Sequence, residues 1–222
     1  MNKTKFALNA THLRILALFL MLLDHLWATV VPGNAWMTYV GRMAFPIFAF
    51  QAAEGYRRTH DFRGYCKRLA IFALISEIPF NLMIMGSPIF PFHQNVMLTL
   101  LLGLLTCRAY DRKKWFVMVG WVLVGAISLC DYGALGVMTV LMFHVFREQK
   151  LLQLLMLIVI NWFGFEGQQL VIGALNVPVQ AFAILALIPI SLYNGEKGQG
   201  GKALQYGSYI FYPLHMLILG LL

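Results

Sequence analysis

Asp24 and His25 stand side by side within Leu13–Val31, a stretch that is otherwise almost wholly apolar. The stretch approaches the roughly 20 residues that a transmembrane helix needs. A carboxylate near the centre of such a helix costs roughly 2.5–3.5 kcal/mol to insert. The pair therefore requires a partner, a water-filled cavity or a chemical role, and ionisable residues inside a membrane indicate a functional site. A helix–helix hydrogen bond that stabilises a bundle is the structural alternative.

The composition places the whole chain in the class of membrane proteins. Hydrophobic residues make up 60% of its 222 residues and charged residues only 12%, whereas soluble domains have about 25% charged residues. We therefore expect an all-α, polytopic transmembrane helix bundle that forms a single integral membrane domain over residues 1–222. The net charge of +8 does not indicate nucleic-acid binding, because the basic residues lie in short clusters between apolar segments. The cysteines have neither a disulfide pattern nor a metal-binding spacing.

Apolar runs predict about nine membrane spans, within a range of roughly eight to ten. The predicted spans are Leu13–Val31, Met37–Tyr56, Leu69–Met85, Asn95–Tyr110, Trp115–Leu129, Gly133–Phe146, Leu151–Phe165, Val177–Tyr193 and Tyr206–Leu222. The run from Gly133 to Phe146 is the shortest, and it is also compatible with a re-entrant or tilted element.

Lysine and arginine occur in alternate connections, and this pattern sets the orientation. Lys3, Lys5 and Arg14 precede or open the first span, and the other basic clusters follow the second, fourth, sixth and eighth spans. Because basic loops stay in the cytoplasm, the pattern predicts a cytoplasmic N-terminus and an extracytoplasmic C-terminus. Arg42, near the outer end of the second span, is the exception.

With this orientation, the polar residues of the spans form two groups. The group at middle-to-outer depth consists of Asp24, His25, Arg42, Glu77, Asn81, Asn95 and His215, and the group at the cytoplasmic ends consists of Arg14, Glu54, Arg57 and Arg58. Glu77 and Asn81 are one helical turn apart and share a face. Histidine beside carboxylates fits general base catalysis, in which imidazole takes a proton from an attacking amine or hydroxyl. It also fits proton-coupled transport along a chain of Asp, Glu and His.

Each of these residues also has a structural interpretation. Glu77 can pair with Arg42 and neutralise it, and His215 can form an interhelical hydrogen bond. Asn95, with Gln94 before it, can cap a helix. The basic residues at the cytoplasmic ends can serve only to set the orientation of the chain in the membrane.

Several sequence blocks resemble the TraX family of inner-membrane proteins, which is named for a conjugative pilin N-acetylase. The blocks extend over almost the whole chain and are Leu13-Arg14-Ile15 through Leu23-Asp24-His25, Gly41-Arg42-Met43-Ala44-Phe45-Pro46-Ile47-Phe48, Glu54-Gly55-Tyr56-Arg57-Arg58-Thr59, Ser76-Glu77-Ile78-Pro79-Phe80-Asn81, Gln94-Asn95-Val96 and Tyr212-Pro213-Leu214-His215. The spacing of Arg14 and His25 is also similar to the Arg-x10-His signature of integral-membrane O-acyltransferases. Asp24 directly before His25 departs from that signature.

The resemblance implies a bacterial inner-membrane acetyltransferase. It would move an acetyl group from cytoplasmic acetyl-CoA to an extracytoplasmic amine or hydroxyl, on a pilin N-terminus or a surface glycan. A basic mouth would suit the CoA phosphates; its residues are Arg14, Arg57, Arg58 and Arg68, with Glu54 among them. No metal and no nucleic acid is expected, and lipid surrounds the chain.

The same resemblance assigns provisional catalytic roles. His25 would act as the general base, while Asp24 or Glu77 would orient an imidazole. His215 belongs to the same candidate set, and an oxyanion would be stabilised by one of three outer residues, namely Arg42, Asn81 or Asn95. The alternative function is a small proton-coupled transporter or a scaffold of an envelope or conjugation complex. Transporters often contain internal repeats, and no repeat is visible in this sequence.

Overall fold

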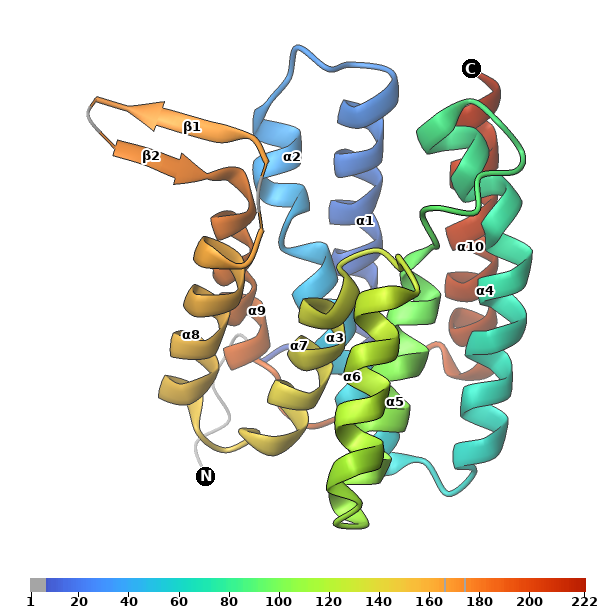
Figure 1. Ribbon diagram of the computed structural model, residues 1–222, viewed down its shortest axis with the longest axis vertical. Helices are drawn as coiled ribbons and strands as arrows, with labels where there is room; N and C mark the ends of the chain where they lie inside the picture. Colours follow the sequence, from blue (N-terminus) through green and yellow to red (C-terminus); the bar gives the residue numbers. More distant parts are fainter. Residues whose placement is uncertain (1–6, 166, 174) are drawn as a thin grey trace. The chain divides into compact units, whose positions relative to one another are not determined.

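The computed structural model describes residues 7–165, 167–173 and 175–222, so Lys3 and Lys5 of the orientation pattern lie outside the described residues. Most of this chain is α-helical, which confirms the all-α prediction (Figure 1). The helices are α1 (Ala10–Thr29), α2 (Trp36–Gly41), α3 (Ala44–Arg58), α4 (Phe62–Met85), α5 (Val96–Asp111), α6 (Trp115–Ile127), α7 (Gly133–Val145), α8 (Lys150–Ile158), α9 (Leu187–Ser191) and α10 (Gly201–Leu221).

The chain divides into two compact units, each assembled from two segments. The first unit comprises Met1–Gln51 and Lys150–Ile210, and the second comprises Ala52–Gln149 and Phe211–Leu222. The boundaries fall inside α3 and α10, so each of these helices contributes to both units. A single integral domain over residues 1–222 stays a prediction.

The second predicted span is not one continuous helix. Instead of a helix over Met37–Tyr56, the chain forms α2 and α3, separated by Arg42 and Met43. Pro46 explains the break, because its ring would clash with the carbonyl group of Arg42 in an uninterrupted helix. As the third residue of α3, Pro46 occupies a position where the missing N–H has no intrahelical partner in any case.

The predicted span over Val177–Tyr193 is also wrong as a continuous α-helix. The structure has an antiparallel hairpin of β1 (Gln169–Ile172) and β2 (Leu175–Pro178), then a 3₁₀ helix (Val179–Ala186) and α9. Pro178 and Pro189 remove two N–H donors that one long helix would need. Gly173 in the hairpin turn has a φ of +61°, which glycine adopts without steric cost.

Two helices of the described residues, α1 and α4, are long and apolar enough to cross a membrane, and four other apolar helical stretches have only 10–17 residues. The nine predicted spans are therefore not confirmed. On α4, the apolar side chains of Ile71, Leu74, Ile75 and Ile78 are exposed at a spacing of three and four residues. Such a stripe lies along one helix face, and a large exposed apolar patch marks a surface for lipid or protein contact.

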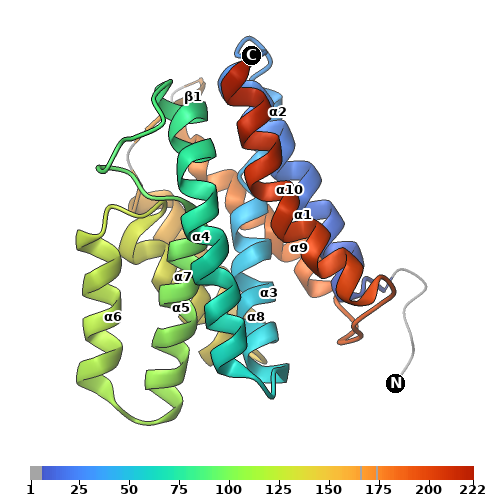
Figure 2. The same cartoon turned by 90° about the vertical axis from the view of Figure 1, so that its right-hand side faces the viewer.

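The second unit is a helical bundle in which α5, α6 and α7 pack together and α4 lies beside α5 (Figure 2). Glycines allow the close approach. A Cβ atom on Gly103 of α5 would lie 2.6 Å from Cβ of Val140 on α7, and one on Gly125 of α6 would lie 2.8 Å from Cγ2 of Val137. The last turn of α10 packs on the end of α4 in the same way, since a Cβ on Gly220 would lie 2.8 Å from the backbone nitrogen of Met83.

Candidate functional site

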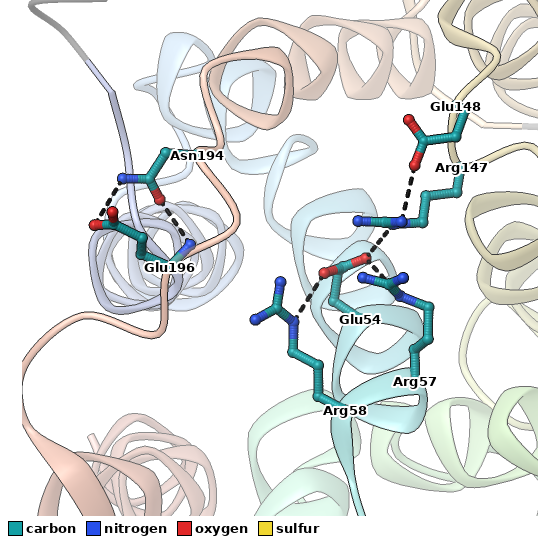
Figure 3. Close-up of polar contacts among 7 residues, drawn as sticks. All are labelled: Glu54, Arg57, Arg58, Arg147, Glu148, Asn194 and Glu196. Carbon is teal, nitrogen blue, oxygen red and sulfur yellow. Dashed lines mark hydrogen bonds and ion pairs between the residues drawn. The ribbon is translucent and has the colours of Figure 1, made fainter. Parts of the chain in front are cut away.

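A buried carboxylate near the end of α3 forms ion pairs with three arginines. Glu54 is 7% exposed, and its Oε1 lies 2.9 Å from Nε of Arg147 and 3.6 Å from Nε of Arg57. Its Oε2 accepts a hydrogen bond of 3.1 Å from Nε of Arg58. Figure 3 shows the three guanidinium groups around the carboxylate. We call these four residues the Glu54 cluster.

The Glu54 cluster carries a net positive charge. Arg57 and Arg58 follow Glu54 at spacings of three and four residues, so they share its helix face. Arg147 comes from the segment that follows α7, and its Nη1 also pairs with the exposed Glu148 at 2.8 Å. Three guanidinium cations thus face two carboxylates, and the arginine side chains remain between 35% and 42% exposed. A half-exposed basic cluster of this kind is suited to bind an anion.

Arg68, on α4, is connected through Tyr65 to the residue that follows Glu54. Its Cζ is 5.8 Å from the ring centroid of Tyr65, and the Tyr65 ring packs over Gly55, where an added Cβ would lie 3.0 Å from the phenol oxygen. Tyr65 thus connects Arg68 to the residue that follows Glu54. Arg14 lies on α1 in the first unit, and its membership of the basic mouth stays a prediction.

Sequence reasoning missed three residues at this end of the second unit. They are Asp111, His144 and Arg147, none of which belongs to the candidate set predicted from the sequence. The Asp111 carboxylate accepts a hydrogen bond of 2.8 Å from the Tyr56 hydroxyl and contacts Nε2 of His144 at 2.8 Å. The spacing of three residues between His144 and Arg147, at a predicted cytoplasmic helix end, is the signal that could have grouped them.

A second set of polar residues connects α4 to the start of α5. Oε2 of Glu77 accepts hydrogen bonds from the backbone N–H of Asn95, at 3.3 Å, and from its side-chain amide. The same Asn95 amide donates to the Ala73 carbonyl at 2.8 Å, and Asn95 Oδ1 caps α5 by accepting from the Met97 N–H. The predicted capping role of Asn95 is thus confirmed. Because an amide nitrogen has two hydrogens, these contacts leave none for an oxyanion.

Among the described residues, α4 has four buried polar side-chain atoms without a hydrogen-bond partner. One is Nε of Arg68, and the other three lie close together further along the helix: Oγ of Ser76, Oε1 of Glu77 and Oδ1 of Asn81. Buried polar groups are almost always hydrogen-bonded, so each exception requires an explanation. The last three atoms lie within six residues of one helix, which makes this segment a candidate binding site.

The loops around residues 93 and 131 lie next to the start of α5. Nε2 of His93 is 3.7 Å from Oδ1 of Asp131, and the Asp131 N–H donates to the Gln94 carbonyl at 2.8 Å. Contact with the Asp131 carboxylate raises the pKa of His93 above its usual value; burial opposes the shift, and Glu77 adds to it. Leu129 and Tyr132 have φ values of 55° and 62°, and such strained backbone clusters at functional sites.

His215 lies in the C-terminal half of α10 and is buried. Its Nδ1 is 2.8 Å from the Phe211 carbonyl oxygen. A carbonyl oxygen only accepts, so Nδ1 carries the proton, and Nε2 is the basic nitrogen of the neutral ring. Because α4 and α10 run in the same direction (Figures 1 and 2) and touch at Gly220 and Met83, a rise of about 1.5 Å per residue places His215 near the level of Glu77.

The remaining candidates lie in the first unit. Nη2 of Arg42 is 3.3 Å from Oδ1 of Asp24, and Nε and Nη2 of Arg42 donate to the Thr38 hydroxyl at 3.2 and 3.0 Å. The structure therefore gives Asp24 as a partner of Arg42. His25 follows Asp24 on α1 and is half-buried. The predicted outer group is thus divided between two sets, Asp24, His25 and Arg42 in the first unit and Glu77, Asn81, Asn95 and His215 in the second.

Exposed apolar helices together with buried ionisable residues define a helical membrane protein. Residues 9–222 match the family described as TraX protein, and the chain belongs to that family. The probable fimbrial assembly protein FimC, serogroup H1, of Dichelobacter nodosus is 26% identical over 238 aligned residues, which cover 95% of this chain and 94% of the relative. No solved structure matches the chain.

Proposed function

We propose that this protein is an inner-membrane acetyltransferase that moves an acetyl group from cytoplasmic acetyl-CoA to an extracytoplasmic amine or hydroxyl. The observation that carries the proposal is the Glu54 cluster, which presents three half-exposed arginines around one buried carboxylate. Membership of the TraX family supports acetyl transfer. The relative named as a fimbrial assembly protein supports an acceptor in a pilus, and a surface glycan is the second acceptor class.

The Glu54 cluster suits the phosphates of CoA for a geometric reason. Each arginine contacts Glu54 through Nε, so the carboxylate orients the three planar guanidinium groups. Guanidinium groups bind phosphate through parallel N–H···O bonds, and they do so more specifically than lysine. Arg68 is proposed as a fourth cation, because its guanidinium lies over the ring of Tyr65, which contacts Gly55 beside Glu54.

The orientation of the chain supports the same assignment. The basic clusters predict that the Glu54 cluster faces the cytoplasm, with the N-terminus inside and the C-terminus outside. On α4, Glu77 is nine positions after Arg68, which corresponds to about 14 Å along the helix. Acetyl-CoA is an extended molecule, with phosphates at one end and the acetyl thioester at the other. It therefore suits a site that has cationic groups at one level of α4 and polar groups at another level.

In the proposed reaction an imidazole acts as general base. It takes a proton from the acceptor amine or hydroxyl as the acceptor attacks the thioester carbonyl; the C–S bond then breaks, and the CoA thiolate leaves and is protonated. His25 is the first candidate for the base, with Asp24 and Arg42 as its neighbours on the first unit. His215 is the candidate in the second unit, because its basic nitrogen is Nε2. The proposed oxyanion donor is Arg42 if His25 is the base, and Asn81 if His215 is the base.

The test is binding of acetyl-CoA to the purified protein in nanodiscs. Acetyl-CoA should raise the unfolding temperature, and Arg58→Ala should weaken this effect because one guanidinium is lost from the Glu54 cluster. Arg63→Ala is the matched control, since Arg63 is an exposed arginine of the same region. High salt should also weaken binding, because the contacts are half-exposed. Absence of any thermal shift at millimolar acetyl-CoA would contradict the proposal and favour a proton-coupled transporter or a scaffold.

A further inference from the structure

We propose that the β1–β2 hairpin is a lipid-binding element that lies flat among the headgroups of the bilayer, on the side opposite the basic loops. The hairpin belongs to the first unit and contributes no residue to the proposed acetyl transfer, so the inference does not depend on that function. Within its unit the hairpin extends sideways from the ends of the neighbouring helices (Figure 1).

The first argument is the composition of the hairpin and of the helices beside it. From Leu151 to Tyr193 the sequence contains a single charged residue, Glu166. The edge strands of soluble proteins are usually protected by charged side chains, whereas this hairpin exposes Val171 and Leu175 to 67% and 68%. An uncharged segment with exposed apolar side chains is suited to contact lipid.

The second argument is the distribution of side chains over the two faces of the hairpin. Leu170 is paired with Val177 across the two strands, and Leu175 lies on the same face because side chains alternate along a strand. The exposed amides of Gln169 and Asn176 lie on the opposite face. An amphipathic element of this kind lies in the plane of the interface, with its apolar face toward the acyl chains.

The third argument is the length of the helix that leads to the hairpin. The basic clusters predict that Lys150 lies at the cytoplasmic surface, and the helical stretch Lys150–Phe163 begins there. At about 1.5 Å per residue this stretch is at most about 21 Å long, whereas the hydrocarbon core is about 30 Å thick. It therefore does not carry the hairpin into bulk water. Trp162 and Phe163, both exposed at its end, are of the type that favours the membrane boundary.

The fourth argument limits the depth of the hairpin. A two-stranded sheet has two open edges, and such edges do not occur within the hydrocarbon region because their N–H and C=O groups would lack partners. The strands therefore lie where headgroups and water reach them, and the leaflet is thinner around the first unit. Two hydrogen bonds fix the base of the hairpin: the Gln180 amide donates to buried Asn161 at 3.1 Å, and the Val179 N–H donates to the Gln168 carbonyl at 2.9 Å.

The experiment measures the depth of nitroxide spin labels on the whole protein in phosphatidylcholine nanodiscs. Leu175→Cys, Asn176→Cys and Gln199→Cys are each labelled, and collision rates with oxygen, which concentrates among acyl chains, and with a water-soluble nickel chelate are compared. The oxygen-to-nickel ratio should be highest at Leu175 and several-fold lower at Asn176, its exposed neighbour on the opposite face. It should be lowest at Gln199, the matched control, which is exposed in the polar loop after α9.

The labelling background is Cys66→Ser, because Cys66 is half-buried whereas Cys107 and Cys130 are buried. If Leu175→Cys does not fold, Val171→Cys replaces it and should give a ratio above that of the loop control. Free access of the nickel chelate to the hairpin labels would place the hairpin in water, and low access of both reagents would mean that a protein surface covers it. Either result would overturn the inference, and equal ratios at Leu175 and Asn176 would contradict the flat orientation.

Discussion

Arg42, in the break between α2 and α3, forms an ion pair with Asp24 on α1 at 3.3 Å. The ion pair connects the segment just before α3 to the C-terminal half of α1 within the first unit. It also places a positive charge against the carboxylate beside His25.

The first prediction concerns this ion pair. Asp24→Asn and Arg42→Gln should each destabilise the protein by roughly 1–3 kcal/mol, because each leaves a largely buried polar partner without its counter-charge. The double variant should be less destabilised than the sum of the two, since both charges are then absent. Denaturant unfolding in mixed micelles gives the three values. Strict additivity would mean that the pair contributes no coupling energy.

The second prediction concerns the close approach of α2 to α1. A Cβ atom on Gly41 would lie 2.5 Å from Cβ of Asp24, so Gly41→Ala should cost about 1–3 kcal/mol through overpacking. Gly120 on α6 has no atom within 4 Å of an added Cβ. Gly120→Ala is therefore the matched control and should be neutral or stabilising, since alanine favours helix by up to about 1 kcal/mol. Equal unfolding temperatures of the two variants would contradict the observed helix contact.

The positions of single helices were largely predictable from the sequence. Val96–Asp111 and Gly133–Val145 fall within one residue of the predicted spans, because an apolar run between polar ends is a local signal. The apolar pattern does not show the break before α3, because the apolar run continues through it. Pro46 is the local residue that does indicate the break.

The contacts of the candidate sites were less predictable. Glu54 pairs with Arg147, which lies 93 residues further along the chain, and no local pattern specifies such a contact. Asn95 makes both kinds of contact, one that the local sequence predicts and others that it does not. Its capping of α5 follows from residue type and position, whereas its bonds to Ala73 and Glu77 depend on the packing of α4 against α5.

The third prediction is a pH dependence at the loops around residues 93 and 131. Contact with Asp131 raises the pKa of His93, so the folded state binds this proton more tightly than the unfolded state. The resulting stability is present below the unfolded pKa of about 6.5 and is lost as pH rises through the higher folded pKa. The unfolding temperature should fall over that window, and His93→Asn should remove this fall. His60→Asn, at an exposed histidine, is the control and should preserve it.

The last prediction concerns the general base. His25→Ala should leave expression and folding nearly intact, because it removes a polar group from a largely apolar helix. Acetyl transfer should decrease by roughly 10²–10⁴-fold, the usual contribution of a general base, and Asp24→Asn should cost less if Asp24 only serves as the partner of Arg42. His215→Ala, assayed in parallel by mass spectrometry of acetylated envelope proteins and glycans, tests the base of the second unit. A folded His25→Ala protein with full activity, beside an inactive His215→Ala, would assign proton transfer to α10 and a structural role to the polar pair of α1.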